Sequence, residues 1–122
     1  SELEKLTAIV HPRIRQMVDD RIAAARRDPD VPVLVLEAAI LLDSGWDAIT
    51  DEVWVVVADP VEIRRRLAEA RGLSEAEVDA RAGKQMSDEE RRSRADVLVH
   101  NDGTSDELRL EVERLWLERV NP

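Results

Sequence analysis

The sequence predicts an α/β fold in which parallel strands are flanked by helices. Two short apolar runs, residues 31–36 and residues 53–58, are rich in β-branched side chains, and a third run follows at residues 97–100. Stretches with helical periodicity lie between and around these runs, and no hairpin turn joins one run to the next. Strands that alternate with helices in this way pair in parallel and are connected by right-handed crossovers.

The first predicted helix begins at His11 and Pro12, because proline is tolerated in the first turn of a helix. Apolar residues then recur at helical spacing, at Ile14, Met17, Val18 and Ile22. The next element, residues 31–36, reads Val-Pro-Val-Leu-Val-Leu. A continuous apolar run of this length predicts a strand that is buried on both faces.

The second apolar run leads directly into a helix. It ends at Asp59 and Pro60, where aspartate can cap a helix and proline can occupy its first position. The helix that begins there has Ile63 and Leu67 on one face and ends at Gly72.

Capping signals mark three further helix starts. Residues 74–77 (Ser-Glu-Ala-Glu) and residues 87–90 (Ser-Asp-Glu-Glu) each place a serine three positions before a glutamate. Residues 104–107 (Thr-Ser-Asp-Glu) repeat the pattern after the third strand and the turn at residues 101–103 (Asn-Asp-Gly). The last helix carries apolar residues on one face, namely Leu108, Val112 and Leu115.

The three tryptophans are predicted to differ in environment. Trp54 lies within the second strand and Trp116 within the last helix, so both are expected in the core. Trp46 follows a Ser-Gly turn and is expected at the surface or in a pocket.

Composition restricts the classes of function. The chain has 122 residues, enough for one domain, and 18 basic against 27 acidic residues give a net charge of -9. This balance argues against binding nucleic acid by neutralising phosphates. The absence of cysteine excludes disulfides, thiolate metal sites and a cysteine nucleophile, and two histidines leave little for an imidazole metal site. No apolar run reaches the roughly 20 residues of a membrane span, so we expect a soluble, intracellular protein.

Ligands of open parallel sheets bind beyond the carboxyl ends of the strands, so polar residues there are candidates. Glu37 follows the first predicted strand and Asp43 lies six residues further on. The pair could bind a hydroxyl group or a metal-bound water, or could cap and solvate a turn. His11 could donate to an anionic ligand or cap its helix.

A basic stretch of nine residues falls within residues 64–94: Arg64, Arg65, Arg66, Arg71, Arg81, Lys84, Arg91, Arg92 and Arg94. It contains no aromatic residue on which a base could stack. One interpretation is that some of these side chains bind phosphate. The other is a solvated helix face with local ion pairs such as Glu62 with Arg66.

No complete active site is predicted. The four glycines are scattered, no G-x-x-x-x-G-K-[ST] loop occurs, and neither histidine has the context of a catalytic triad. We therefore expect no catalytic residue and no metal ligand in this chain.

Taken together, these residues resemble the dephospho-CoA kinase family. The resemblance spans nearly the whole chain and rests on several segments in order: residues 6–12 (LTAIVHP), residues 35–45 (VLEAAILLDSG), residues 55–60, Arg66 with Leu67, residues 71–74 with Gln85, Arg91, Ala95 with Asp96, and residues 101–103. Three differences stand out: Ala39 occupies a position where the family usually has proline, a family lid arginine falls on Ala70 rather than Arg71, and neither the P-loop nor the catalytic aspartate has a counterpart.

The resemblance implies a P-loop kinase fold, with three layers in which helices flank a parallel sheet, and a helical lid at about residues 64–94. Residues 1–122 would be the carboxy-terminal part of that domain. The sheet would be incomplete, because the family's first strand lies between the strands at residues 31–37 and 53–58. The implied activity is transfer of the γ-phosphoryl group of ATP, with Mg²⁺, to the 3′-hydroxyl group of dephospho-CoA. This is the last step of coenzyme A biosynthesis, in the cytoplasm, and it would belong to the complete enzyme.

The resemblance also implies roles for single residues on the nucleotide side. Arg71 and Arg91 would contact the phosphates of ATP as the lid closes, and Gln85 would support the lid. Asn101 and Gly103 would lie against the adenine.

On the acceptor side, His11, Glu37 and Asp43 would border the dephospho-CoA pocket. Two other hypotheses stay open. The chain could be a catalytically silent module that binds a partner, such as the missing amino-terminal part, or self-associates. It could also be a relative of the nucleoside monophosphate kinases, which a panel of substrates would distinguish.

Overall fold

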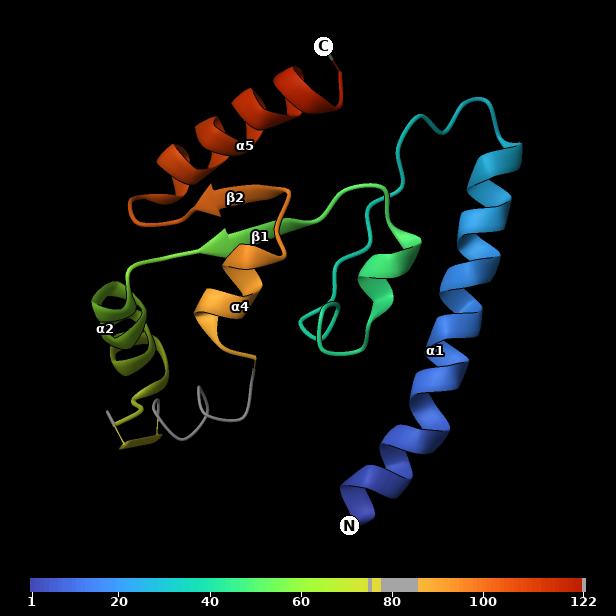
Figure 1. The fold of residues 1–122 in the computed structure, drawn as a ribbon. Helices are drawn as coiled ribbons and strands as arrows, with labels where there is room; N and C mark the ends of the chain where they lie inside the picture. The colour runs from blue at the N-terminus through green and yellow to red at the C-terminus, as the bar shows by residue number, and fades with distance from the viewer. Residues whose placement is uncertain (75, 78–85, 122) are drawn as a thin grey trace. The chain divides into compact units, whose positions relative to one another are not determined.

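The computed structural model describes residues 1–74, 76–77 and 86–121 and divides the chain into two compact units, Ser1–Ala39 and Ile40–Pro122. The first unit contains helix α1 (Glu2–Arg27). The second contains, in order, the 3₁₀ helix η1 (Trp46–Ile49), β1 (Trp54–Val57), α2 (Pro60–Arg71), α4 (Asp88–Ser93), β2 (Val97–His100) and α5 (Ser105–Arg119) (Figure 1). The α/β class is confirmed.

Helix α1 begins nine residues before the predicted start at His11, so that prediction was wrong. A capping box fixes the start: the Glu4 amide donates to Ser1 Oγ at 3.2 Å, and the terminal amino group donates to Glu4 Oε2 at 2.6 Å. Pro12 therefore lies inside the helix. Proline disfavours a helix interior because it has no N–H to donate to the preceding turn, yet the cap and the flanking helix-forming residues outweigh this local cost.

Residues 31–36 do not form the predicted buried strand. They are irregular in the structure, and Val35 keeps 70% of its surface exposed. A strand is stabilised by hydrogen bonds to a neighbouring strand, and the described part of the first unit offers none. The β-branched composition favours a strand, but composition does not supply a pairing partner.

In the second unit, β1 and β2 pair in parallel, as predicted. The register places Trp54 opposite Val97 and Val57 opposite His100. Asp96 anchors the start of the pair, because its carboxylate accepts from the Val53 amide at 2.7 Å and its own amide donates to the Val53 carbonyl at 2.9 Å.

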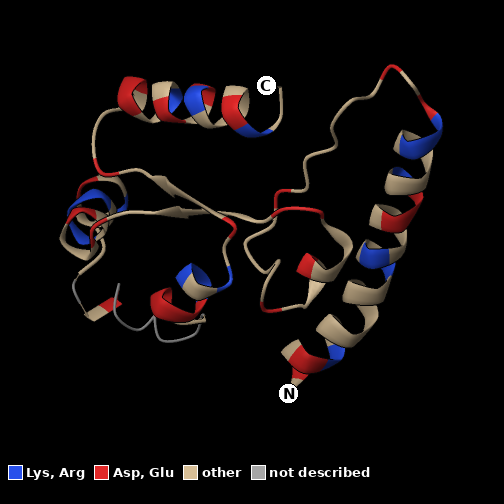
Figure 2. Cartoon of the chain, turned by 45° about the horizontal axis from the view of Figure 1, so that its top comes forward, with Lys and Arg blue, Asp and Glu red and all other residues tan. Residues whose placement is uncertain are grey.

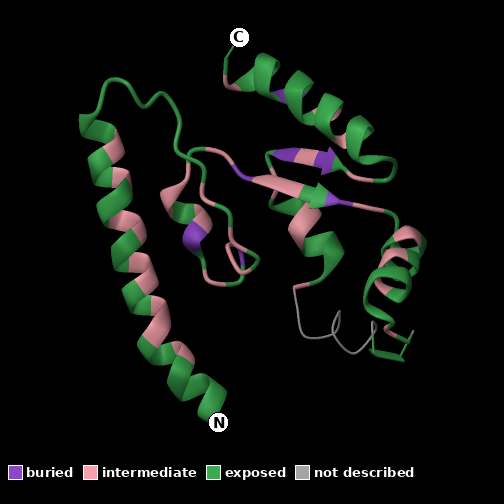
Figure 3. Cartoon of the chain, turned by 180° about the vertical axis from the view of Figure 1, so that it is seen from behind, coloured by how far each residue is buried: buried purple, intermediate pink, exposed green. Residues whose placement is uncertain are grey.

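Helix α5 covers the sheet at β2 and provides the core. Val97, Val99 and Leu115 form a buried cluster, against which Trp54 and Leu108 pack. Figure 3 shows the buried residues gathered on the strands, with further buried positions on the facing side of α5 and in the turn before η1. Burial of apolar side chains against the two strands is therefore the main source of stability in this unit.

Two of the three tryptophans differ in environment from the prediction. Trp54 packs against the core as predicted, but Trp46 is buried at 6% exposure and Trp116 is 37% exposed. Trp46 is drawn inward by a turn in which its amide donates to the Leu41 carbonyl at 2.9 Å and Gly45 takes a left-handed φ of 71°. Periodicity could not reveal the burial of Trp46, because this burial depends on a reversal of the chain and not on helical spacing.

The predicted caps are confirmed. The side chain of Asp59 accepts from the Val61 amide at 2.8 Å, and α2 ends at Gly72 with a left-handed φ of 63°. Ser74 and Glu77 exchange the two hydrogen bonds of a capping box. The later caps follow the same rule, with Ser87 accepting from Glu90 and Thr104 accepting from Glu107.

One carboxylate links the start of β1 to the end of α5. Glu52 Oε1 accepts from Trp54 Nε1 at 2.6 Å and from Arg119 Nε at 2.6 Å. The hydrogen bond from Arg119, followed by that from Trp54, holds the pKa of Glu52 below its ordinary value. This contact closes the unit at the end of the sheet opposite to residues 101–103.

Over the described ranges, every helix is too short or too polar to cross a lipid bilayer.

We predict that Leu115→Ala lowers the free energy of unfolding by about 2–5 kcal/mol, because it removes a buried side chain and leaves a cavity against β2. Leu117→Ala is the matched control: it lies on the same helix at 60% exposure and should change the free energy by less than about 0.5 kcal/mol. Urea unfolding followed by tryptophan fluorescence measures both. Equal effects for the two variants would contradict the packing of α5 on the sheet.

Candidate functional site

The carboxyl ends of β1 and β2 lie at the same edge of the sheet, as the parallel arrangement predicts. Asn101 continues the pairing past β2, since its amide donates to the Val57 carbonyl at 2.8 Å. The loop after β1 (residues 58–59) and the loop after β2 (residues 101–104) therefore leave the sheet side by side. This edge is where parallel α/β sheets bind their ligands.

The two loops are joined directly through Asp102. Its Oδ1 accepts a hydrogen bond from the Asp59 amide at 2.7 Å, while Asp59 Oδ1 accepts from the Val61 amide at 2.8 Å. Both carboxylates thus satisfy backbone N–H groups where α2 begins, a position that favours negative charge. The Asp102 contact ties the loop after β2 to the cap of α2.

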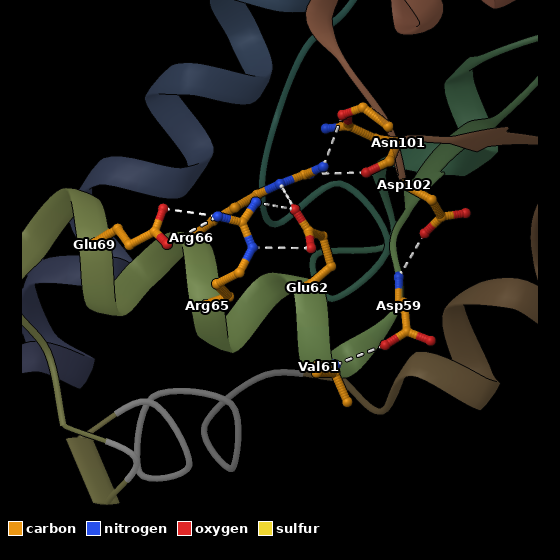
Figure 4. A network of polar contacts seen from close by, with 9 residues as sticks. Asp59, Val61, Glu62, Arg65, Arg66, Glu69, Asn101 and Asp102 are labelled. Carbon is orange, nitrogen blue, oxygen red and sulfur yellow. Dashed lines mark hydrogen bonds and ion pairs between the residues drawn. The ribbon is translucent and has the colours of Figure 1, made fainter.

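Arg66 forms the second link, and it reaches from α2 to the same loop (Figure 4). Its Nη1 donates to the Asn101 carbonyl at 2.7 Å and its Nη2 donates to the Gly103 carbonyl at 3.0 Å. Its Nε donates to Glu62 Oε1 at 2.9 Å. Because all three guanidinium nitrogens bind the protein itself, Arg66 holds the backbone of residues 101–103 in place.

Sequence reasoning found only part of this role. The predicted local pair of Glu62 with Arg66 is confirmed. The contacts of Arg66 with two carbonyl groups more than thirty positions away were missed, because nothing in the local sequence distinguishes Arg66 from its arginine neighbours.

Glu62 is the centre of the charge network on α2. It accepts hydrogen bonds from both Arg65 and Arg66, and Arg65 also donates to Glu69 at 2.7 Å. The hydrogen bond from Arg65 is the main reason that the pKa of Glu62 lies below its ordinary value, and the two carboxylates in turn raise the pKa of Arg65. For Arg65 and Arg66 the structure therefore supports the solvated-face interpretation.

The other predicted phosphate-binding arginines lie near the ends of helices. Arg71 is the exposed last residue of α2 and makes no ion pair with any described residue. Arg91 lies on α4 and is half-buried. Its Nε is buried and has no hydrogen-bond partner in the part of the chain that the structure describes. Gln85, the predicted lid support, falls outside the described residues.

The three predicted acceptor-side residues lie in both units of the chain. His11 is half-buried inside α1, so the alternative that it caps a helix is wrong. Glu37 is exposed after residues 31–36, in the first unit, and Asp43 is exposed in a turn of the second. Their grouping around one ligand stays a prediction.

No group of three or more His, Cys, Asp or Glu side chains within the described ranges could hold a metal ion by itself. The carboxylates at the sheet edge, Asp59 and Asp102, already accept backbone hydrogen bonds.

Comparison with known proteins identifies a matching family. The family model for dephospho-CoA kinase matches residues 1–107. A dephospho-CoA kinase from Geobacter sulfurreducens is 40% identical over 119 residues, covering 98% of this chain and 60% of the relative. One from Corynebacterium diphtheriae is 43% identical over 113 residues, covering 92% of this chain and 56% of the relative.

A solved structure has a similar fold. The crystal structure of TT1252 from Thermus thermophilus matches with a TM-score of 0.75 at 32% sequence identity, over 96% of this chain and 59% of that protein. This chain thus spans roughly half to three fifths of the length of the proteins compared here.

We predict that Glu62 titrates below its ordinary pKa of 4.5 and that Arg65→Met raises this pKa more than Arg66→Met does, because Arg65 is the stronger hydrogen-bond partner. A depressed pKa means that the stabilisation from Glu62 is fully present above about pH 4.5 and is lost as the pH falls through the folded-state pKa.

Carboxyl chemical shifts measured by NMR against pH report the pKa directly, and Glu62→Gln identifies the resonance. In Glu62→Gln the stability should vary less with pH across this window than in the unmodified chain. A Glu62 pKa at or above 4.5 in the unmodified chain would contradict the network drawn in Figure 4.

Proposed function

This chain belongs to the dephospho-CoA kinase family, and from that premise we propose that it takes part in transferring the γ-phosphoryl group of ATP to the 3′-hydroxyl group of dephospho-CoA. The reaction is the last step of coenzyme A biosynthesis, and we place it in the cytoplasm. The observation that carries the proposal is the joined sheet edge, where Asp102 and Arg66 fix residues 101–103 beside the start of α2. Phosphoryl transfer depends on such positioning more than on covalent chemistry by the protein.

On the nucleotide side, Asn101 and Gly103 lie against the adenine of ATP. Support comes from the backbone of this loop, which Arg66 holds at two carbonyl groups. A loop held by such contacts loses less conformational entropy when it binds a base.

Arg71 and Arg91 contact the phosphates of ATP as a lid formed by about residues 64–94 closes, and Gln85 supports that lid. Arg65 and Arg66 are occupied by carboxylates and carbonyl groups, which leaves the phosphate-binding role to other arginines. Arg91 Nε is buried and has no partner among the described residues. This supports Arg91 as a phosphate-binding residue, since such a group gains a hydrogen bond when an anion binds.

On the acceptor side, His11, Glu37 and Asp43 border the dephospho-CoA pocket. All three are polar, and Glu37 and Asp43 are exposed, so the carboxylates can accept hydrogen bonds from hydroxyl groups of an acceptor.

The sequence holds no G-x-x-x-x-G-K-[ST] stretch, so we assign the phosphate-cradling loop and the catalytic base to a part of the enzyme outside these 122 residues. Residues 1–122 then form the carboxy-terminal part of a three-layer P-loop kinase domain.

ATP is used as its magnesium complex. Mg²⁺ neutralises phosphate charge during transfer and usually keeps several waters, with few protein ligands. No step of the proposal requires a metal ligand from the described residues.

The test uses the natural gene product that carries this sequence, incubated with ATP, Mg²⁺ and dephospho-CoA. We expect coenzyme A, with its added 3′-phosphate detected by mass spectrometry. A panel of nucleoside monophosphates should be phosphorylated far more slowly. Preference for a nucleoside monophosphate, or binding of a partner chain with no phosphoryl transfer, would overturn the proposal.

For the lid, we predict that Arg91→Met and Arg71→Met each lower kcat/KM for ATP by about ten- to a hundredfold, because each removes a charge-assisted hydrogen bond to phosphate. Arg65→Met serves as the control, since the ion pairs of Arg65 with described residues are to Glu62 and Glu69 on its own helix, and it should change kcat/KM by less than about threefold. Steady-state kinetics with varied ATP measures all three. Unchanged constants for Arg71→Met and Arg91→Met would remove the lid assignment.

A further inference from the structure

Arg94 connects two segments of the second unit that lie far apart in sequence. It is the residue that caps the carboxyl end of α4, where its amide donates to the Arg91 carbonyl. Its side chain leaves the helix: Nη1 donates to the Leu42 carbonyl at 3.3 Å and Nη2 donates to Asp47 Oδ2 at 3.0 Å. Nη1 also lies 3.9 Å from the sulfur of Met86. One guanidinium group thus forms hydrogen bonds at two points of the turn at residues 42–47.

Arg92 offers a direct comparison on the same helix. Its side chain is 37% exposed, as is that of Arg94. Arg92, however, pairs with Asp88 one turn earlier at 2.6 Å, which is a contact within α4. The two side chains are equally exposed but have different partners. The long-range contact of Arg94 therefore differs from an ordinary surface ion pair such as that of Arg92.

The turn held by Arg94 has a defined shape. The Ser44 amide donates to the Ile40 carbonyl at 2.8 Å, and Gly45 adopts a left-handed backbone. Leu42 and Trp46 point inward and are buried, whereas Asp43 between them is exposed. The carbonyl gripped by Arg94 immediately precedes Asp43, so a shift of this contact moves the Asp43 backbone.

Arg94 also lies close to the proposed phosphate-binding residue of α4. Arg91, which we propose to bind phosphate, is three residues before Arg94, in the last turn of the helix that Arg94 caps. Arg94 therefore connects the nucleotide-binding helix to the turn that carries Asp43.

We propose that Arg94 is a positioning residue for the acceptor side: it sets the orientation of Asp43 through the Leu42 carbonyl and the Asp47 carboxylate. The inference rests on the proposed function, in which Asp43 borders the dephospho-CoA pocket. Arg94 does not touch the acceptor itself. Its loss therefore weakens the binding of dephospho-CoA while the binding of ATP is preserved.

The experiment measures KM for dephospho-CoA and KM for ATP in the natural gene product and in four variants. Arg94→Met removes both contacts, Arg94→Lys keeps the charge but lacks the planar guanidinium with two separate Nη donors, and Asp47→Asn removes the charge of the partner. Arg92→Met is the matched control. Differential scanning fluorimetry reports whether each variant is folded.

We expect Arg94→Met to raise KM for dephospho-CoA about tenfold, with KM for ATP changed less than about twofold, and Arg94→Lys and Asp47→Asn to lie in between. Arg92→Met should leave both constants within about twofold. If Arg94→Met does not fold, Asp47→Asn and Arg94→Lys carry the same test.

An equal rise in both KM values, or none in that for dephospho-CoA, overturns the role of Arg94 and leaves the proposed function standing. Failure of the unmodified protein to phosphorylate dephospho-CoA overturns the proposed function, and with it this inference.

Discussion

The parallel pairing of β1 with β2 is the constraint on which the second unit depends. Its register fixes Val57 opposite His100, and the following residues can then leave the sheet only at one shared edge. The hydrogen bond from Asp59 to Asp102 and the contacts of Arg66 with the loop carbonyls become possible because of this register. A slip of one residue would turn Val97 and Val99 away from Leu115 and would separate the two loops as well. Core packing and site geometry are therefore set by the same interaction.

The parts of the fold that sequence predicted are those determined by local interactions. Asp59 caps a helix because its own side chain reaches an amide two positions on, and Gly72 ends that helix because it can adopt a positive φ. The first helix was placed too late because Pro12 was given more weight than the capping box of Ser1 and Glu4. Both signals are local, but proline weakens a helix interior without forbidding it.

The parts that sequence did not predict depend on contacts between distant residues. Residues 31–36 have the composition of a strand, but a strand also needs a partner, and composition does not reveal whether one is present. Trp46 is buried because a turn folds it inward, and Trp116 is half-exposed although it lies on the helix that supplies Leu115. Of the candidate site, sequence predicted the shared edge and residues 101–103. It did not predict the contacts of Arg66 with the carbonyl groups of that loop or those of Arg94 with the turn at residues 42–47, because these partners lie far away in the sequence.

The arginines of this acidic chain fall into two groups. In one group the partners lie one helical turn away, and in the other they lie far away in the sequence or no described carboxylate pairs with the arginine. Figure 2 shows acidic and basic residues following one another along the helices, and in α2 and α4 many of these neighbours form ion pairs one turn apart. Such pairs cancel charge locally, so an arginine in the middle of a helix contributes little positive potential to a ligand. Arg71, at the end of α2, lies beyond the reach of this cancellation by described carboxylates, and the partial negative charge of the helix carboxyl end favours a cation there. In the proposed function, Arg71 at the end of α2 supplies positive charge to phosphate although the chain as a whole carries a net charge of -9.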